Sequence, residues 1–460
     1  MLGLGRIAVA ALAVSLVPIA AAGGSGGIQE NAAKTQTAAR SADIDWPHFR
    51  FDKNHTGYQP FETTLSKDNI ASAELLWEDD LDTGGESFVY FSSPAVVNGV
   101  VYIGTDDGYL FAYSADGCGG GICETPLWKS TYIPQVIDSP AVANGIVYVG
   151  SQTNYFSAAG KLDAFAADGC GQSVCAPLWQ GDAGPDSIIE SSPAVWKGLV
   201  FVGAYDGKLY AFNAQGCGKR HCTPVWVGTL GAGTVSSPVI YKRTVFIGAN
   251  DGKLYAFNAT GCGKSTCKPL WTGDFGEDYG ASPSVSNDIV YIASSGYGEG
   301  HLSALSAFAA NGCGTKSCTP LWQGVLPQNY YDFTGSPAIA HGRVYVPAEA
   351  DTNGVAVYPA AGCGQPTCNM LWMLDGSGDQ SAIESSPTIA NGVVYAGRNT
   401  GEVLAWADPC RQQECEQIWT GVTAAGQIVN SSPTVVNGKI YIGSSDLGPE
   451  GILYVYGLPQ

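Results

Sequence analysis

Four oxygen-bearing side chains stand just ahead of a recurring Ser-Pro dipeptide. They are Asp138 (VIDSP), Glu190 (IIESSP), Glu384 (AIESSP) and Asn430 (IVNSSP). Carboxylate and amide oxygens of these types are the ligands that calcium takes in proteins. Because each lies one or two positions before its Ser-Pro, we expect all four on one ring of the fold. They are our candidate metal ligands, and the alternative is that they are solvated residues at a channel rim.

Two other residues break the local pattern in a way that could serve a ligand. Arg398, in AGRNTGE, occupies a position where most equivalent residues are small or acidic, so it could face an anion or form a surface salt bridge. Trp196 could stack on a flat cofactor, as could Trp406, or both could pack between structural units. The five histidines show no metal-ligand spacing: His48, His55, His221, His301 and His341.

The fourteen cysteines form seven Cys-x4-Cys pairs, each at the same place in a repeated unit: Cys118/Cys123, Cys170/Cys175, Cys217/Cys222, Cys262/Cys267, Cys313/Cys318, Cys363/Cys368 and Cys410/Cys415. Zinc would need four ligands, whereas each unit offers two. In an exported protein, paired cysteines are disulfides by default. Each short loop so closed contributes roughly 2 kcal/mol, and we expect the bridges to rigidify outer hairpins. No Cys-x2-Cys-His haem signature is present.

A second marker of the unit occurs eight times, not seven. Its tryptophans are Trp77, Trp128, Trp179, Trp226, Trp271, Trp322, Trp372 and Trp419. Eight Ser-Pro dipeptides keep step with them, at Pro94, Pro140, Pro193, Pro238, Pro283, Pro337, Pro387 and Pro433. Trp77 has no repeat body before it, and the last body has no tryptophan after it. A circular array closed by its own ends accounts for both counts.

One unit, residues 237–273, shows what the repeat folds into. Short apolar runs alternate with turn signals, such as Asn-Gly at Asn98 and Asp-Gly at Asp251. This pattern predicts four short antiparallel strands per unit, and radial four-stranded units are the blades of a propeller. We therefore predict an all-β, eight-bladed β-propeller of four-stranded antiparallel blades, closed by residues 74–81 pairing with the C-terminal blade. The recurring tryptophans should pack between blades.

The ends and the composition indicate an exported chain. Residues 1–22 read as a signal peptide, 23–43 as a disordered leader, and 44–460 as the propeller, with 44–73 a non-repeat segment across one face or the rim. No other segment could span a bilayer. The net charge of −19 argues against nucleic acid and anionic membranes as partners. We expect a monomer that is secreted, either to the periplasm or outside the cell.

The rhythm Ser-Pro…NG-VY-G…DG-LYAF…LW, with the opening DWPHFRFDKNHTGYQP, resembles the PQQ-like repeat superfamily of quinoprotein alcohol dehydrogenase-like propellers. The resemblance covers residues 45–457. That superfamily holds calcium- and PQQ-dependent dehydrogenases as well as non-catalytic relatives such as BamB. The enzymes need a hydrophobic sandwich for the quinone, basic partners, a calcium ion and a catalytic carboxylate. Many also carry a lid of adjacent cysteines, and this chain has no Cys-Cys dipeptide.

These observations favour a non-catalytic propeller that binds a protein, a glycan or a small molecule at one face, with no cofactor. The alternative is a dehydrogenase that uses PQQ and calcium to oxidise an alcohol or sugar. A glycan hydrolase would need paired carboxylates about 5 to 10 Å apart. We expect Glu190 and Glu384 to face each other across the channel, too far apart for that reaction.

Overall fold

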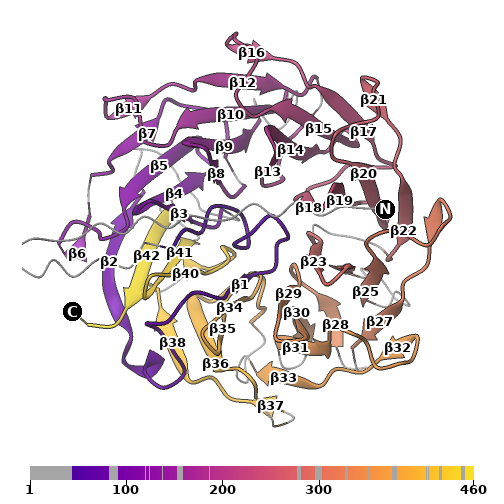
Figure 1. Ribbon diagram of the computed structural model, residues 1–460. Helices are drawn as coiled ribbons and strands as arrows, with labels where there is room; N and C mark the ends of the chain where they lie inside the picture. The colour runs from indigo at the N-terminus through magenta and orange to yellow at the C-terminus, as the bar shows by residue number, and fades with distance from the viewer. Residues whose placement is uncertain are drawn as a thin grey trace, which may run out of the picture. The chain divides into compact units, whose positions relative to one another are not determined.

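Eight β-sheets follow one another around a ring, as the ribbon diagram shows (Figure 1). The computed structural model describes residues 44–81, 92–119, 121–123, 125–136, 138–152, 159–185, 187–276, 281–295, 303–326, 330–350, 353–375, 381–410, 412, 414–423, 427–446 and 451–459. All of them belong to the compact unit Asp43–Gln460. The predicted signal peptide and leader lie outside the described residues. Within these ranges the one helical segment is a short 3-10 turn, η1 (Ile70–Ser72), and no helix is long and apolar enough to cross a membrane.

Each blade has four antiparallel strands, named here from the innermost to the outermost. In blades 1 to 4 these are β3 (Ala95–Val97), β4 (Val100–Thr105), β5 (Tyr109–Ser114), β7 (Trp128–Ser130); β8 (Ala141–Ala143), β9 (Ile146–Ser151), β10 (Lys161–Ala166), β12 (Trp179–Asp182); β13 (Ala194–Trp196), β14 (Leu199–Ala204), β15 (Lys208–Asn213), β17 (Trp226–Thr229); β18 (Val239–Tyr241), β19 (Thr244–Ala249), β20 (Lys253–Asn258), β22 (Trp271–Asp274).

In blades 5 to 8 they are β23 (Ser284–Ser286), β24 (Ile289–Ala293), β25 (Ala304–Ala309), β27 (Trp322–Val325); β29 (Ala338–Ala340), β30 (Arg343–Ala350), β31 (Gly354–Pro359), β33 (Trp372–Asp375); β34 (Thr388–Ala390), β35 (Val393–Arg398), β36 (Glu402–Ala407), β38 (Trp419–Val422); β40 (Thr434–Val436), β41 (Lys439–Asp446), β42 (Gly451–Gly457), β2 (Glu74–Asp80). Blade 8 thus combines the two ends of the repeat region. Its strand β2 runs antiparallel to β42, with Glu78 opposite Tyr454.

The sheets have more strands than the four that the sequence predicted. In seven blades the outermost strand also pairs, in parallel, with a two-residue strand from the cysteine loop of the next blade. These are β6 (Gly121–Ile122), β11 (Val174–Cys175), β16 (His221–Cys222), β21 (Thr266–Cys267), β26 (Ser317–Cys318), β32 (Thr367–Cys368) and β37 (Glu414–Cys415). Among the described residues, strand β38 of blade 7 has no such partner, because blade 8 has no cysteine loop. There Trp419 Nε1 donates to Ala73 O instead, at 3.0 Å.

Three further short strands extend individual sheets. Strand β28 (Tyr330–Phe333) pairs with β30, and β39 (Gln427–Ile428) pairs with β41. Strand β1 (Tyr58–Gln59) of the N-terminal segment pairs in parallel with β34.

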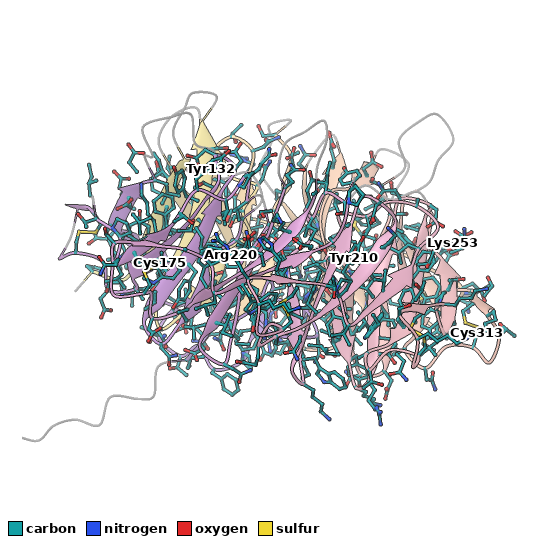
Figure 2. All side chains as sticks on the ribbon, turned by 90° about the horizontal axis from the view of Figure 1, so that it is seen from above. Tyr132, Cys175, Tyr210, Arg220, Lys253 and Cys313 are labelled. Atoms are coloured by element: carbon teal, nitrogen blue, oxygen red, sulfur yellow. A yellow bond between two sulfur atoms is a disulfide. The ribbon has the colours of Figure 1, made fainter. Side chains whose placement is uncertain are left out.

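All seven cysteine pairs are bridged within their own blades, with Cα–Cα distances of 5.6 to 6.1 Å. Figure 2 shows Cys313 near the outer edge of the propeller. The bridge holds the turn that carries the parallel strand, so it fastens one blade to the rim of the preceding one. These loops join neighbours at the periphery, far from the central axis.

The second cysteine of each pair is buried, which the cysteine spacing did not predict. Cys118 is exposed, whereas its partner Cys123 is only 3% exposed and packs in one hydrophobic cluster with Trp77 of the preceding blade. The cause is the contact between blades, because the backbone N–H of Cys123 donates to Glu78 O of β2 at 2.8 Å. The same burial recurs at Cys175, Cys222, Cys267, Cys318, Cys368 and Cys415. One cysteine of each bridge therefore belongs to the core between blades.

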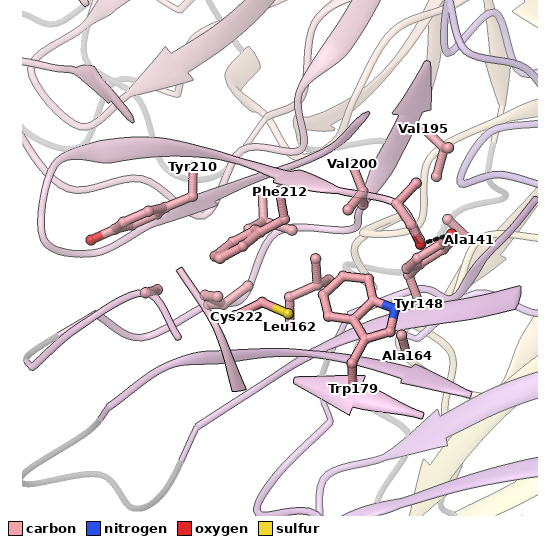
Figure 3. Close-up of a cluster of buried hydrophobic side chains, with 14 of the residues drawn as sticks. Ala141, Tyr148, Leu162, Ala164, Trp179, Val195, Val200, Tyr210, Phe212 and Cys222 are labelled. Carbon is pink, nitrogen blue, oxygen red and sulfur yellow. Dashed lines mark hydrogen bonds between the residues drawn. The ribbon is translucent and has the colours of Figure 1, made fainter. Parts of the chain in front are cut away.

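The recurring tryptophan packs between blades, as the sequence predicted. Trp179 of blade 2 lies among Phe212, Val200 and Cys222 of blade 3 (Figure 3). Its indole covers Gly216, where an added Cβ would come within 2.7 Å of the ring. Gly216 has φ of +74°, a conformation that glycine adopts without strain. Five other tryptophans meet an equivalent glycine of the next blade, namely Trp77, Trp128, Trp226, Trp271 and Trp322.

The N-terminal segment crosses the centre of the ring (Figure 1). In six blades the residue two positions after the Ser-Pro proline donates its backbone N–H to a carbonyl of this segment. Examples are Val142 to Pro47 O at 2.7 Å and Ile339 to Thr56 O at 2.7 Å. The segment therefore runs along the innermost strands and covers one mouth of the central channel.

Candidate functional site

The eight serines of the Ser-Pro dipeptides form a closed ring of hydrogen bonds around the channel. Each donates its backbone N–H to the hydroxyl of the corresponding serine in the next blade, at 2.8 to 3.1 Å. The order is Ser93, Ser139, Ser192, Ser237, Ser282, Ser336, Ser386, Ser432 and back to Ser93. A proline follows every serine, and proline favours an extended backbone at the residue before it. We call this set the serine ring.

The residue before each ring serine has a separate structural task. In five blades it is a serine whose hydroxyl accepts a hydrogen bond from a glycine N–H of the second strand, as Ser191 does from Gly203 at 2.6 Å. In blade 2 this position is Asp138, and its Oδ2 accepts the same bond from Gly150 at 2.8 Å. Asp138 is therefore one residue nearer its Ser-Pro than the other three candidates. It replaces a structural serine and has a second carboxyl oxygen to spare.

Glu190, Glu384 and Asn430 share the position one step earlier, in blades 3, 7 and 8. Since blades 3 and 7 are four apart in a ring of eight, Glu190 and Glu384 belong to opposite sides of the channel. Glu384 accepts a bond from Asn399 Nδ2 at 3.3 Å. All three side chains are partly buried.

One cavity of about 300 Å³ brings the four candidates together. Its lining also includes six members of the serine ring and three aromatic side chains. One of the three, Phe49, belongs to the N-terminal segment. The lining residues are Phe49, Asp138, Glu190, Ser192, Tyr205, Val235, Ser237, Ala281, Ser282, Ser295, Phe333, Thr334, Gly335, Ser336, Glu384, Ser386, Asn430 and Ser432.

In the part of the chain that the structure describes, three polar atoms of the residues that line the cavity are buried without a hydrogen-bond partner. They are Asp138 Oδ1, Asn430 Oδ1 and Ser295 Oγ. Asp138 is only 2% exposed. Buried polar atoms are nearly always paired in folded proteins, so these three are exceptions, and each lies too deep to be touched by a water-sized group in the cavity.

Burial governs the protonation of the two neighbouring carboxyls. It raises the pKa of Asp138 well above its usual range, and the nearby Asp163 and Glu190 carboxylates raise it further. Burial also raises the pKa of Glu190 to about 6. A positive charge placed beside them would reverse both shifts, because an opposite charge favours the ionised carboxylate.

The residues considered for a flat anionic cofactor lie elsewhere. Arg398, in β35, is buried, and its guanidinium pairs with Glu402 at 3.0 Å. Trp196 packs between blades 3 and 4 with Lys197 over its ring, and Trp406 is fully buried between blades 6 and 7. None of the three lines the cavity.

The described part of the lining offers PQQ no basic partner. PQQ carries three carboxylates and needs basic partners, yet the charged residues among the described part of the lining are all acidic. Within the described ranges, no three His, Cys, Asp or Glu side chains come close enough together to hold a metal ion. Asp138, Glu190 and Glu384 share a cavity without forming a coordination shell.

The sequence alone had not singled out the aromatic and hydroxyl parts of the lining. In the sequence, the Ser-Pro dipeptides mark the repeat. The presence of a serine in every unit was the signal that could have indicated a shared polar role. Phe49 belongs to a segment without repeats, so no pattern placed it at the axis. Tyr205 stands in a turn, and Phe333 stands in β28, a short strand that extends the sheet of blade 6.

Comparisons with known structures agree with this architecture. BamB from Moraxella catarrhalis matches with a TM-score of 0.57 at 17% identity, covering 84% of this chain and 97% of that one. Quinohemoprotein alcohol dehydrogenase from Comamonas testosteroni matches with a TM-score of 0.61 at 14% identity, covering 90% and 80%. A europium-containing methanol dehydrogenase matches with a TM-score of 0.63 at 11% identity, covering 90% and 98%. At these identities the likeness concerns the fold alone.

The search of curated proteins finds no match to this chain. A family model described as "Outer membrane protein assembly factor BamB" matches residues 62–307 and 260–457, nearly the whole propeller. The repeat rhythm, the eight blades and this match together show that the chain belongs to the PQQ-repeat propeller family described by the name of BamB.

Proposed function

We propose that this chain is an exported, non-catalytic binding protein whose ligand occupies the central cavity. The observation that carries the proposal is the preformed cavity of about 300 Å³, which gathers three acidic and three aromatic side chains among its described lining residues. A preformed cavity with a few convergent polar groups is the usual form of a small-molecule site. The signal-peptide pattern and seven disulfides support export.

The family has both binding and enzymatic members, so the fold leaves the function open. The charge of the lining favours the binding function. A dehydrogenase of this family would need cations for PQQ, and the arginine considered for that task is paired with Glu402 outside the cavity. We therefore expect no PQQ-dependent oxidation.

The test combines redox reconstitution with a binding screen on the mature chain. Incubation with PQQ and calcium should change neither the melting temperature nor the reduction of a dye in the presence of alcohols or sugars. A panel of small cationic, neutral and anionic solutes should include at least one that raises the melting temperature, because a ligand that binds only the native state stabilises it.

A cavity-filling variant locates the effect. Val235 lines the cavity, so Val235→Trp should abolish the stabilisation. Val422→Trp is the matched control, since this valine is 66% exposed on the outer strand β38. PQQ-dependent dye reduction would replace the proposal with the dehydrogenase. A panel without effect, or an effect that survives Val235→Trp, would refute it.

A further inference from the structure

The outermost strand of blade 7, β38, is an open edge at the rim of the propeller (Figure 1). In the other seven blades this edge carries a two-residue parallel strand from the cysteine loop of the next blade. Among the described residues, no strand pairs with the outer side of β38. An uncovered edge presents backbone N–H and C=O groups with which another strand can pair.

Two threonines in equivalent positions show the difference between a covered and an open edge. Thr272 and Thr420 each follow the recurring tryptophan of their blade, and the N–H of Thr272 donates to Lys316 O at 2.9 Å. In the part of the chain that the structure describes, the outward N–H and carbonyl of Thr420 have no hydrogen-bond partner. Thr420 is exposed, whereas Thr272 and its six equivalents on covered strands are half-buried or buried.

The contact between β38 and the N-terminal segment leaves this edge accessible. Trp419 Nε1 donates to Ala73 O at 3.0 Å, and Trp128 Nε1 donates in a similar way to Ala167 O at 3.3 Å. Strand β7, which begins at Trp128, nevertheless carries its parallel partner β11. Strand β38 also contains no charged residue and no proline, which are two of the means by which proteins protect an exposed edge.

The covered edges show what kind of segment fits. The bonds to the outer strand are made by backbone atoms, as between Cys123 N–H and Glu78 O at 2.8 Å. In six of the seven short strands the second residue is the buried cysteine, and the first residue varies: Val174, His221, Thr266, Ser317, Thr367 and Glu414. The requirement is therefore an extended backbone with a small side chain at its second position.

A second copy of this chain has no such segment to offer. All seven of its cysteine-loop strands already pair with the preceding blade. Its own β38 is the remaining candidate, and the two-fold symmetry usual for dimers would pair two such edges antiparallel. The covered edges are all parallel, so the segment that fits belongs to a different polypeptide.

We propose that β38 binds an extended segment of another polypeptide, which adds to blade 7 as a parallel fifth strand. The site continues a row of seven interfaces that the chain builds with its own loops. The N–H and carbonyl of Thr420 pair with the backbone of the incoming segment, and its small second side chain lies against Trp419. Strand addition of this kind takes its affinity from backbone hydrogen bonds. The site is separate from the central cavity and does not depend on the ligand proposed there.

The chain itself supplies a probe for this site. A synthetic peptide with the sequence of residues 260–269, closed by its own disulfide, contains the strand β21 that covers the edge of blade 3. In the mature chain, the amide of Thr420 should exchange with solvent at least about tenfold faster than that of Thr272, because paired amides are protected. Millimolar peptide should slow exchange at Thr420 and leave Thr272 unchanged.

Two variants of Thr420 separate backbone pairing from loss of the fold. Thr420→Pro removes the outward N–H, and proline is tolerated on edge strands. Thr420→Val keeps both backbone groups and suits a strand. Peptide binding, measured by fluorescence anisotropy, should weaken at least about tenfold in Thr420→Pro and remain within about twofold of the parent in Thr420→Val, since one variant loses a hydrogen bond and the other does not.

A modified peptide tests the same contact on the unaltered protein. Methylation of the peptide nitrogen that corresponds to Cys267 removes the donor for Thr420 O, so this peptide should bind at least about tenfold more weakly. The result does not depend on how well Thr420→Pro folds.

Three results would overturn the proposal. Exchange at Thr420 as slow as at Thr272 in the free chain would mean that the edge is already covered. A peptide that does not bind, or that binds equally well after methylation, would mean that β38 does not take a parallel strand. A mass of two chains in solution that Thr420→Pro reduces to one would make a second copy the occupant in place of another polypeptide.

Discussion

At the scale of single residues, burial decides what the candidate carboxylates can do. Among the described residues that line the cavity of Asp138 and Glu190 none is basic, and burial raises the pKa of both carboxyls. A protein keeps such groups only at a cost in stability, and perturbed acids of this kind concentrate at binding and active sites. Asn399 and the serine hydroxyls supply polar contacts without adding charge.

Glu190 should make stability depend on pH in a predictable direction. Its pKa is about 6 in the folded state and near 4.5 when unfolded. The folded state therefore binds more protons between these values, and the stability contributed by this group falls as pH rises from 4.5 to 6. Glutamine does not titrate, so the melting temperature of Glu190→Gln should fall less than that of the parent as pH rises from 4.5 to 7. If the melting temperatures of the variant and the parent change in parallel with pH, the expectation is wrong. Asp68→Asn, which alters an exposed carboxylate at the surface, serves as the control.

At the scale of elements, the tryptophan contacts between blades require glycine at positions where a larger side chain would collide with the indole. Gly216 and Gly218 form a matched pair, since both have φ of +74°. A Cβ on Gly216 would meet Trp179 at 2.7 Å, whereas nothing lies within 4 Å of a Cβ on Gly218. The conformational cost of alanine is common to both sites, and only one substitution displaces the indole.

Gly216→Ala should therefore destabilise the protein by about 1 to 3 kcal/mol more than Gly218→Ala, the usual range for overpacking. Chemical denaturation of both variants gives the difference directly. Equal losses would mean that Trp179 shifts without cost and that the contact between blades 2 and 3 is loose.

The N-terminal segment should make the protein sensitive to acid. Burial, followed by the charge of Arg50 and by His48, lowers the pKa of His55 to about 3. The unfolded chain binds a proton near 6.5, so the stability from this group is present above pH 6.5 and is lost as pH falls toward 3. The loss is about 1.4 kcal/mol per pH unit.

His55→Asn removes the titrating group at a position with φ of +53°, which asparagine tolerates. Its stability should fall less steeply between pH 6.5 and pH 4.5 than that of the parent. A slope equal to the parent's would show that the segment opens before this histidine is protonated.

At the scale of the whole molecule, the serine ring links every blade to the next. Ser432 donates to Ser93 across the junction between the two ends of the repeat array, at the same 2.9 Å as Ser237 to Ser282 within it. In a closed ring all junctions are equivalent. Ser93→Ala and Ser282→Ala should therefore cost similar amounts, about 1 to 3 kcal/mol each for an orphaned buried N–H.

Thermal and denaturant unfolding of the two serine variants measure this equivalence. An open array would tolerate the loss of its end contact, so a silent Ser93→Ala beside a costly Ser282→Ala would contradict a closed hydrogen-bonded ring.

The sequence by itself determined the period of the repeat, and through it the propeller, the seven bridges and the tryptophans between blades. These features are local, since each unit repeats the same strand lengths, turns and cysteine spacing. It also led to Asp138, Glu190, Glu384 and Asn430, because propeller symmetry places equivalent positions around one axis. It did not lead to the parallel fifth strands or to the burial of Cys123 and its equivalents, which depend on contacts between successive units.

Only the tertiary structure decided what these residues face. Asp138 differs from its neighbours by one position, and that shift gives it the bond of a structural serine and leaves one oxygen over. Phe49 reaches the axis because a segment without repeats crosses the innermost strands. Neither result follows from period or composition, since both depend on the width of the closed ring and on contacts between residues far apart in the chain.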